Sequence, residues 1–125
     1  MDINALNWTA VIVGGVLAFA LGMLWFSPRL FGKAWSEGSH GLVPPASPPV
    51  AAMIITFVGL ALLAIVVGMT ETAQAIGTAI AAILAVAAVV AGMDLFSQKS
   101  GKATLIDAGY VVASGIVMIA AQAIF

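Results

Sequence analysis

The sequence predicts an all-α integral membrane protein with four transmembrane helices in an antiparallel bundle. Of its 125 residues, 63% are hydrophobic and only 7% are charged, whereas a soluble domain carries roughly 25% charged residues. Four apolar runs divide the chain, each about as long as the ~20 residues that a helix needs to cross a bilayer core. No run has a charge at its centre, where insertion would cost roughly 2.5–3.5 kcal/mol. The runs are continuous rather than alternating, which argues against membrane strands.

The predicted helices cover about residues 8–27, 50–69, 73–96 and 104–125 of a single membrane domain, 1–125. A cleaved signal peptide is the alternative for the first run. Such a peptide needs a basic segment before the apolar run and small residues after it. Here Asp2 is the only charge before the run, and the run ends in Trp25, Phe26, Ser27 and Pro28. We therefore interpret it as a transmembrane helix.

The first loop, residues 28–49, opens with a concentration of aromatic and basic side chains in LWFSPRLFGKAW, residues 24–35. Aromatic side chains collect at the membrane–water boundary. The expected interface anchors are Trp25, Phe26, Phe31 and Trp35. Pro28 ends the first helix because it lacks an N–H group. The short segment 29–35 is expected to lie in the interface, with Arg29 and Lys33 facing the lipid headgroups.

The basic residues also predict an orientation. Arg29 and Lys33 follow the first helix, and Lys99 and Lys102 lie in loop 97–103. The N-terminal segment, the turn after the second helix and the C-terminal end contain no Lys or Arg. The positive-inside rule then places loops 28–49 and 97–103 in the cytoplasm and both termini outside.

The fourth helix has a local start signal. Thr104-Leu105-Ile106-Asp107 matches a capping box directly before an apolar run. Thr104 would accept a hydrogen bond from the backbone N–H of Asp107, and the carboxylate would lie at the positive end of the helix dipole.

Two segments of the chain resemble each other. GMLWFSPRLFGKA, residues 22–34, aligns with GMDLFSQKSGKA, residues 92–103, after a one-residue gap. Each follows an apolar run on the same predicted side of the membrane. A duplicated helical hairpin would produce this pattern, and chance similarity in a chain of restricted composition is the alternative.

Small residues recur at helical spacing on the first and third runs. In lipid, such residues allow helix backbones to approach closely. The candidate packing positions are Gly14, Ala18 and Gly22, and Gly77, Ala81, Ala85, Ala88 and Gly92. These stripes would pack inside one bundle or, in the alternative, form the contact between copies of a homo-oligomer.

The motifs at the two ends of the chain resemble a known family. Trp25-Phe26-Ser27-Pro28, followed by Phe31-Gly32-Lys33 and Trp35, is similar to the signature of the Domain of Unknown Function 1761 family. Residues 105–110, LIDAGY, resemble that family's last helix. Phe26 departs from the pattern, because the family often has tyrosine there. The resemblance implies four membrane helices in a bacterial cytoplasmic membrane, and no established activity.

A few ionisable residues are candidates for chemistry. The predicted polar cluster at the cytoplasmic side is Asp94, Asp107, Tyr110, Arg29 and Lys33. An acidic group at membrane depth is a candidate for handling protons or cations. The structural alternative is that Asp94 pairs with Lys99, Lys102 or Arg29, that Asp107 caps a helix and that Tyr110 belongs to an aromatic belt.

Enzyme and metal motifs are not found. His40 has only Glu37 as a local companion, whereas a metal site needs three or four ligands. SGKA, residues 100–103, lacks the upstream glycine of a phosphate loop. Cysteine is absent and the net charge is −1, so neither thiolate chemistry nor nucleic-acid binding is indicated. The prediction is a protein without catalytic residues, metal or cofactor.

The leading functional hypothesis is a packing or interaction protein in the lipid bilayer, as a homo-oligomer or as an accessory subunit of a membrane complex. The alternative is a small channel or transporter for a proton, an ion or a small solute. The transport hypothesis predicts a polar cavity that reaches past Asp94 toward the middle of the membrane. An enzyme acting on lipid at the interface is a third, more distant alternative.

Overall fold

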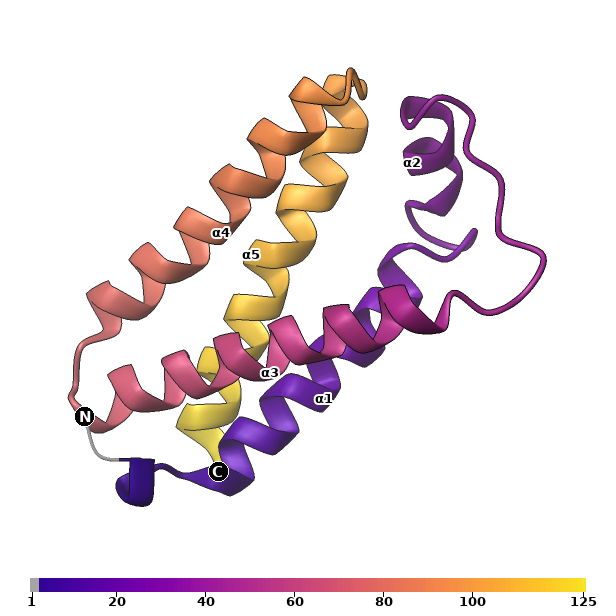
Figure 1. Ribbon diagram of the computed structural model, residues 1–125. Helices are drawn as coiled ribbons and strands as arrows, with labels where there is room; N and C mark the ends of the chain where they lie inside the picture. Colours follow the sequence, from indigo (N-terminus) through magenta and orange to yellow (C-terminus); the bar gives the residue numbers. More distant parts are fainter. Residues whose placement is uncertain (1–2) are drawn as a thin grey trace.

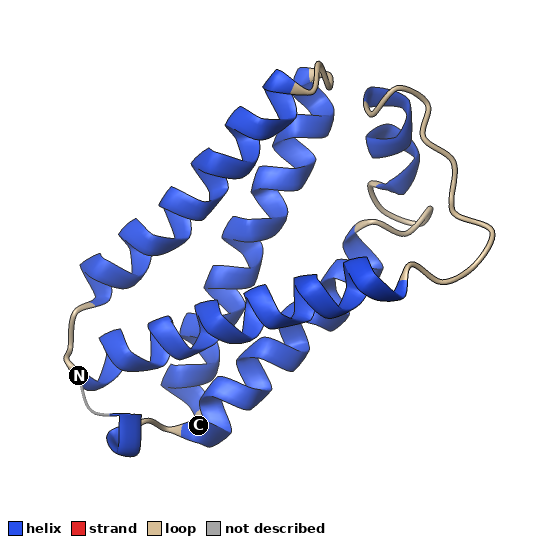
Figure 2. Cartoon of the chain, viewed as in Figure 1, coloured by secondary structure: helices blue, strands red, loops and turns tan. Residues whose placement is uncertain are grey.

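The computed structural model describes residues 3–125 and is helical throughout its ordered elements. A 3-10 helix, η1 (Ile3–Ala5), precedes α1 (Trp8–Trp25), α2 (Gly32–Gly38), α3 (Val50–Thr72), α4 (Ile76–Phe96) and α5 (Gly101–Ile124). No strand occurs in the described chain (Figure 2). Asp2, which entered the signal-peptide argument, lies outside the described residues. The four helices α1, α3, α4 and α5 are long and apolar enough to cross a membrane, which confirms the predicted fold class.

The helices connect two ends of the molecule. The element η1, the α3–α4 turn and the C-terminus lie at one end, whereas α2 and the α4–α5 turn lie at the other (Figure 1). The backbone N–H of Ser100 donates a 2.8 Å hydrogen bond to the carbonyl of Gly38, which joins α2 to the start of α5. The first loop and the α4–α5 turn therefore meet at the same end.

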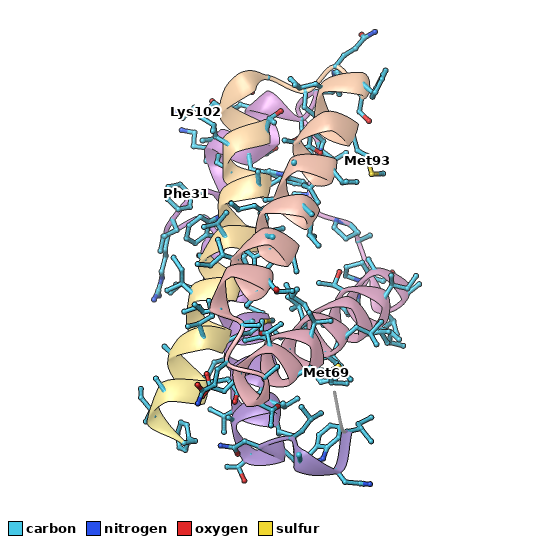
Figure 3. All side chains as sticks on the ribbon, turned by 90° about the vertical axis from the view of Figure 1, so that its left-hand side faces the viewer. Phe31, Met69, Met93 and Lys102 are labelled. Atoms are coloured by element: carbon cyan, nitrogen blue, oxygen red, sulfur yellow. The ribbon has the colours of Figure 1, made fainter. Side chains whose placement is uncertain are left out.

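The helices α4 and α5 lie side by side in both views, whereas α3 diverges from α4 beyond their shared turn (Figures 1 and 3). Residues 50–59 of α3 are all exposed, and its buried positions begin at Leu60. The buried core joins α1 to the second half of α3, to α4 and to α5. Its members are Val11, Ala18, Leu60, Ala64, Val67, Ile83, Tyr110 and Met118.

The start of α5 corrects the predicted capping box. The N-cap is Ser100, whose Oγ accepts from the backbone N–H of Ala103 at 3.0 Å. The Thr104 hydroxyl donates instead to the carbonyl of Ser100 at 2.9 Å. The helix thus begins at Gly101, and Asp107 lies in its second turn rather than in a cap. Its carboxylate is therefore free to bind side chains of other elements.

The segment after α1 also differs from the expected flat interfacial segment 29–35. A tight turn follows Trp25, in which the N–H groups of Leu30 and Gly32 both donate to the carbonyl of Ser27. Helix α2 then starts at Gly32 and packs against α5. Both of the similar segments, 22–34 and 92–103, accordingly end a long helix, turn, and begin a new helix at Gly-Lys-Ala, at residues 32 and 101.

The small-residue stripe of α1 packs within the chain. Gly14 and Ala18 are buried, and a Cβ atom at Gly14 would lie 3.2 Å from the Cα of Met118 on α5. A Cβ atom at Gly22 would lie 2.6 Å from the Tyr110 hydroxyl. The α1 stripe is therefore covered by α5, and the alternative in which this face joins two copies is wrong.

The small-residue stripe of α4 behaves in the opposite way. Its members Gly77, Ala81, Ala85 and Ala88 are exposed, and nothing lies within 4 Å of a Cβ atom built at Gly92. The helix instead buries Ala79, Ile83 and Ala87. Ile83 lies against Gly115 of α5, where only a hydrogen leaves room for its branched side chain. This fit sets the rotation of α4, so the prediction that its stripe packs inside the bundle is wrong.

Candidate functional site

Polar side chains from α2, α4 and α5 meet near the start of α5. The Trp35 indole N–H donates to Asp107 Oδ1 at 2.8 Å, and Lys99 Nζ lies 3.2 Å from Asp107 Oδ2. Lys99 Nζ also lies 3.7 Å from Asp94 Oδ1. We call these four residues, Trp35, Asp94, Lys99 and Asp107, the lysine–carboxylate cluster. Its two carboxylates share a single ammonium group, so with both of them ionised the cluster carries one surplus negative charge.

Asp94 is the most enclosed member of the lysine–carboxylate cluster. Only 9% of its surface is exposed, although it lies near the end of α4. Its Oδ2 atom is buried and has no hydrogen-bond partner. A buried carboxylate oxygen is usually satisfied, because an unmade hydrogen bond costs about 1–3 kcal/mol. Asp94 Oδ2 is therefore an acceptor available to a donor that moves toward it.

The end of α4 positions Lys99. Gln98 adopts a left-handed conformation, with φ 61°, directly after the helix. The N–H of Gln98 then donates to the carbonyl of Leu95, and that of Lys99 donates to the carbonyl of Asp94, both at 3.0 Å. This is a Schellman motif. It turns the chain back over the last turn of α4, so that the Lys99 side chain reaches both carboxylates.

Aromatic side chains attach α1 and α2 to the same part of α5. The Trp25 indole donates to the carbonyl of Ile106 at 2.9 Å, and the Tyr110 hydroxyl donates to the carbonyl of Ala18 at 2.7 Å. Phe26 makes edge-on ring contacts with Trp35 and Tyr110, at centroid distances of 5.7 and 5.4 Å. The indole N–H groups of Trp25 and Trp35 thus both donate to α5. These contacts within the chain are additional to the role of interface anchor expected from the sequence.

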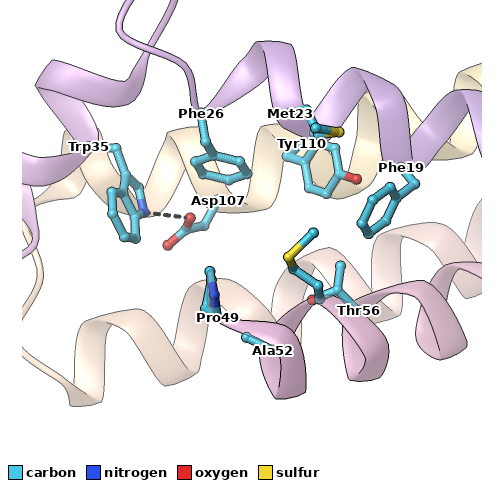
Figure 4. Close-up of a pocket in the computed structure, with 11 residues that line it drawn as sticks. Phe19, Met23, Phe26, Trp35, Pro49, Ala52, Thr56, Asp107 and Tyr110 are labelled. Atoms are coloured by element: carbon cyan, nitrogen blue, oxygen red, sulfur yellow. Dashed lines mark hydrogen bonds between the residues drawn. The ribbon is translucent and has the colours of Figure 1, made fainter. Parts of the chain in front are cut away.

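A pocket of about 530 Å³ lies beside this aromatic group, between α1, α3 and α5, with Trp35 of α2 at its edge. Figure 4 shows Asp107 and Trp35 at one end of the pocket and Phe19 and Thr56 at the other, with Tyr110 between them. The remaining lining residues are apolar: Gly22, Met23, Phe26, Pro49, Ala52 and Met53. Met23, Ala52 and Met53 are exposed, so the pocket is open beside α3.

The structure brings together only part of the predicted polar cluster. Asp94 and Asp107 meet through Lys99, and Tyr110 lies along the pocket from Asp107. Arg29 and Lys33 are exposed, and neither forms an ion pair within residues 3–125. Lys99, considered in the sequence only as a partner of Asp94, is the cation of the site. The contribution of Trp35 has no signal in the sequence beyond its residue type, because it depends on how α2 packs.

His40 has a structural contact at the same end of the molecule. Its Nε2 atom lies 2.8 Å from the carbonyl of Ser97, which links the first loop to the turn after α4. Within residues 3–125, no three His, Cys, Asp or Glu side chains converge in a way that would hold a metal ion.

The family described as "Protein of unknown function (DUF1761)" matches residues 9–121. The chain belongs to this family. The match covers α3 and α4 and nearly all of α1 and α5, and it includes every residue of the pocket and of the lysine–carboxylate cluster. It confirms the resemblance carried by the motifs at residues 25–35 and 105–110. No curated protein and no solved structure gives a significant match to this DUF1761 member.

Proposed function

We propose that this DUF1761 member is a non-enzymatic membrane protein that binds a small, largely apolar solute between its helices and acts as a carrier for it. The observation that carries the proposal is the pocket between α1, α3 and α5, with a carboxylate in its wall. Its volume of about 530 Å³ falls within the roughly 300–1,000 Å³ of small-molecule sites, which combine apolar walls with a few polar groups.

The character of the pocket favours an organic solute over a bare ion. The transport hypothesis from the sequence requires a polar cavity reaching past Asp94, whereas this pocket is mostly apolar and is lined by Asp107 instead. An ion pathway needs polar groups that replace water along its length. Here the polar side chains lie mainly at the two ends, at Asp107 and Thr56 (Figure 4).

The test is solute release from liposomes containing the purified protein and loaded with a panel of small organic cations, neutral molecules and anions. Ala52→Trp fills the pocket from α3, because Ala52 lines it and is exposed. Ala51→Trp is the matched control, since Ala51 is exposed on the same helix but does not line the pocket. We expect release of one solute class by the wild type and by Ala51→Trp, and its loss in Ala52→Trp. Equal solute release from liposomes containing any of the three proteins and from loaded liposomes without protein would contradict the proposal.

Assembly with other membrane helices is the second candidate, as a homo-oligomer or as a subunit of a larger complex. The observation that favours it is the α4 stripe, whose small residues face away from the chain. Native mass spectrometry of gently extracted protein tests it. Ala85→Leu with Ala88→Leu should dissociate an assembly that uses this face, whereas Val89→Leu, which is exposed beside the stripe, should leave it intact. An unchanged mass in the double variant would exclude this face.

The proposed location is a bacterial cytoplasmic membrane, with the end that carries α2 in the cytoplasm. The support is that all four basic residues belong to the first loop, α2, the α4–α5 turn or the first turn of α5, which lie at one end of the molecule. In this orientation the lysine–carboxylate cluster lies toward the cytoplasmic side.

A further inference from the structure

The side chains around Asp107 identify one class of solute, and the inference rests on the proposed function of the pocket. We propose that the pocket binds a small organic cation, an ammonium group carried on apolar carbon, with the charged group against Asp107 and the apolar part along α1 and α3. Lys99 is the internal competitor of this cation for the Asp107 carboxylate.

The charge of the site favours a cation. Asp94 and Asp107 together carry two negative charges when ionised, and Lys99 is the only basic side chain within 4 Å of either in the described chain. A partly buried charge without a counter-charge is costly, because solvent no longer stabilises it. A cationic solute removes the surplus charge, whereas an anion would increase it and a neutral solute would leave it unchanged.

The rings near Asp107 favour an ammonium group with carbon substituents. Phe26 and Trp35 line the end of the pocket near Asp107, and Phe26 also contacts Tyr110, which lies farther along the pocket (Figure 4). Aromatic faces attract cations through their negative charge density, and groups of such rings recognise quaternary ammonium ions. Lys99 Nζ lies 5.0 Å from the centroid of the Trp35 ring, so one cation already contacts this aromatic surface.

The Lys99 side chain has a second carboxylate within reach, that of Asp94. Its Nζ atom lies 3.2 Å from Asp107 and 3.7 Å from Asp94, and Asp94 Oδ2 is buried without a hydrogen-bond partner. A small rotation of the Lys99 side chain toward Asp94 would satisfy that oxygen. It would also release Asp107 Oδ2 to the solute, while Oδ1 continues to accept from Trp35. Solute binding and the position of Lys99 are therefore coupled.

Two flexible side chains suit the open side of the pocket to apolar groups of different shape. Met23 of α1 and Met53 of α3 are both exposed at the pocket. The unbranched thioether of methionine adapts to irregular apolar shapes. The apolar part of the solute is thus less strictly specified than its charge.

Three substitutions separate this mechanism from a merely structural role by the sign of their effect. Asp107→Asn should weaken cation binding by at least about tenfold, because it removes the counter-charge. Lys99→Gln should strengthen binding, because it removes the competing ammonium group. Asp94→Asn should weaken binding, because Lys99 then has Asp107 as its only anionic partner. If the cluster served only to hold the helices together, all three variants would change binding in the same direction.

The experiment measures binding to the purified full chain in phosphatidylglycerol nanodiscs by equilibrium dialysis. The probe is benzyltrimethylammonium, and its uncharged carbon isostere, neopentylbenzene, is the matched control ligand. We expect saturable binding of the cation, with the three directions given above, and binding of the isostere that does not depend on Asp107. Retained isostere binding in the Asp107→Asn variant also shows that this variant is folded.

Two results would overturn the assignment, and a third would reassign the source of the cation. Equal binding of both ligands with no effect of Asp107→Asn would exclude the cation but leave a binding pocket, and with it the proposed function. Absence of saturable binding of either ligand would overturn the proposed function as well. Loss of probe binding when phosphatidylethanolamine replaces phosphatidylglycerol would indicate that the ammonium headgroup of a lipid occupies the site. The proposal that the ligand is a free solute would then be wrong.

Discussion

Trp35 on α2 donates a 2.8 Å hydrogen bond to Asp107 on α5, across 72 residues of sequence. The same carboxylate holds Lys99 at 3.2 Å. Asp107 therefore connects three pieces of the chain: the short helix that follows α1, the turn that follows α4, and α5 itself. One side chain both positions α2 and contributes the charged end of the pocket, so the packing of α2 and the electrostatics of the pocket depend on each other.

This bond predicts the effect of replacing the indole by a ring without an N–H group. Trp35→Phe should keep the ring contact with Phe26 but leave Asp107 Oδ1 without its donor. We expect a loss of about 0.5–2 kcal/mol in stability, with faster hydrogen–deuterium exchange in residues 32–38. Trp8→Phe is the control, because Trp8 is 42% exposed at the start of α1. Unchanged exchange in α2 would show that the bond does not hold this helix.

The two similar segments, 22–34 and 92–103, align Gly22 with Gly92, and these glycines have opposite surroundings. A Cβ atom at Gly22 would lie 2.6 Å from the Tyr110 hydroxyl, whereas one at Gly92 would meet nothing within 4 Å. Gly22→Ala should therefore destabilise the fold by about 1–3 kcal/mol through overpacking. Gly92→Ala should stabilise α4 by up to about 1 kcal/mol, because alanine has the higher helix propensity.

The measurement for this pair is unfolding of the purified protein by titration with a denaturing detergent. The two variants differ from each other only in position, so detergent effects cancel. Similar shifts for both would mean that the approach of Tyr110 to α1 is looser than the 2.7 Å bond from its hydroxyl to the Ala18 carbonyl implies.

The sequence predicts the long helices better than it predicts their contacts. Length and apolar character suffice for a membrane span, so α1, α3, α4 and α5 follow from composition. The rotation of α4 does not follow, because glycine and alanine line more than one of its faces and the choice depends on Ile83 fitting against Gly115. The sequence predicts that α5 starts at residue 104, three residues after its observed start at Gly101. The reason is that Thr104 and Asp107 match the capping-box pattern, whereas Ser100 is followed three residues later by Ala103 rather than by an acidic residue.

The site is predictable to a similar extent. Asp94, Asp107 and Tyr110 stand out as polar groups in apolar surroundings; the structure joins Asp94 to Asp107 through Lys99 and places Tyr110 in the same pocket as Asp107. The sequence groups Arg29 and Lys33 with these residues only because all five are predicted on the same side of the membrane. In the structure, Arg29 and Lys33 are exposed. The pocket itself has no local signal. It lies where the first half of α3, which diverges from α4, faces α1 and α5, and this depends on how all the helices pack rather than on any one segment.

The left-handed residue after α4 predicts a stabilising substitution. Gln98 has φ 61°, a conformation that strains a side chain and that glycine adopts freely. Gln98→Gly should raise the stability by about 0.5–1 kcal/mol, net of the greater freedom of glycine in the unfolded chain. Gln98→Val should lower it, because β-branched residues tolerate this conformation poorly. Thermal unfolding followed by circular dichroism measures both, and a decrease for glycine would contradict the strained turn that positions Lys99.

The absence of cysteine allows a direct test of the proposed orientation. Glu37 in α2 and Glu71 near the end of α3 are both exposed, and they lie at opposite ends of the molecule. With the α2 end in the cytoplasm, a membrane-impermeant maleimide should label Glu71→Cys in intact cells and Glu37→Cys only after permeabilisation. Leu62→Cys, exposed within α3, is the control that should stay unlabelled in lipid. The reverse labelling pattern would contradict the proposed orientation and would place the basic residues outside the cell, against the positive-inside rule. Labelling of both variants in intact cells would mean that α3 does not cross the membrane.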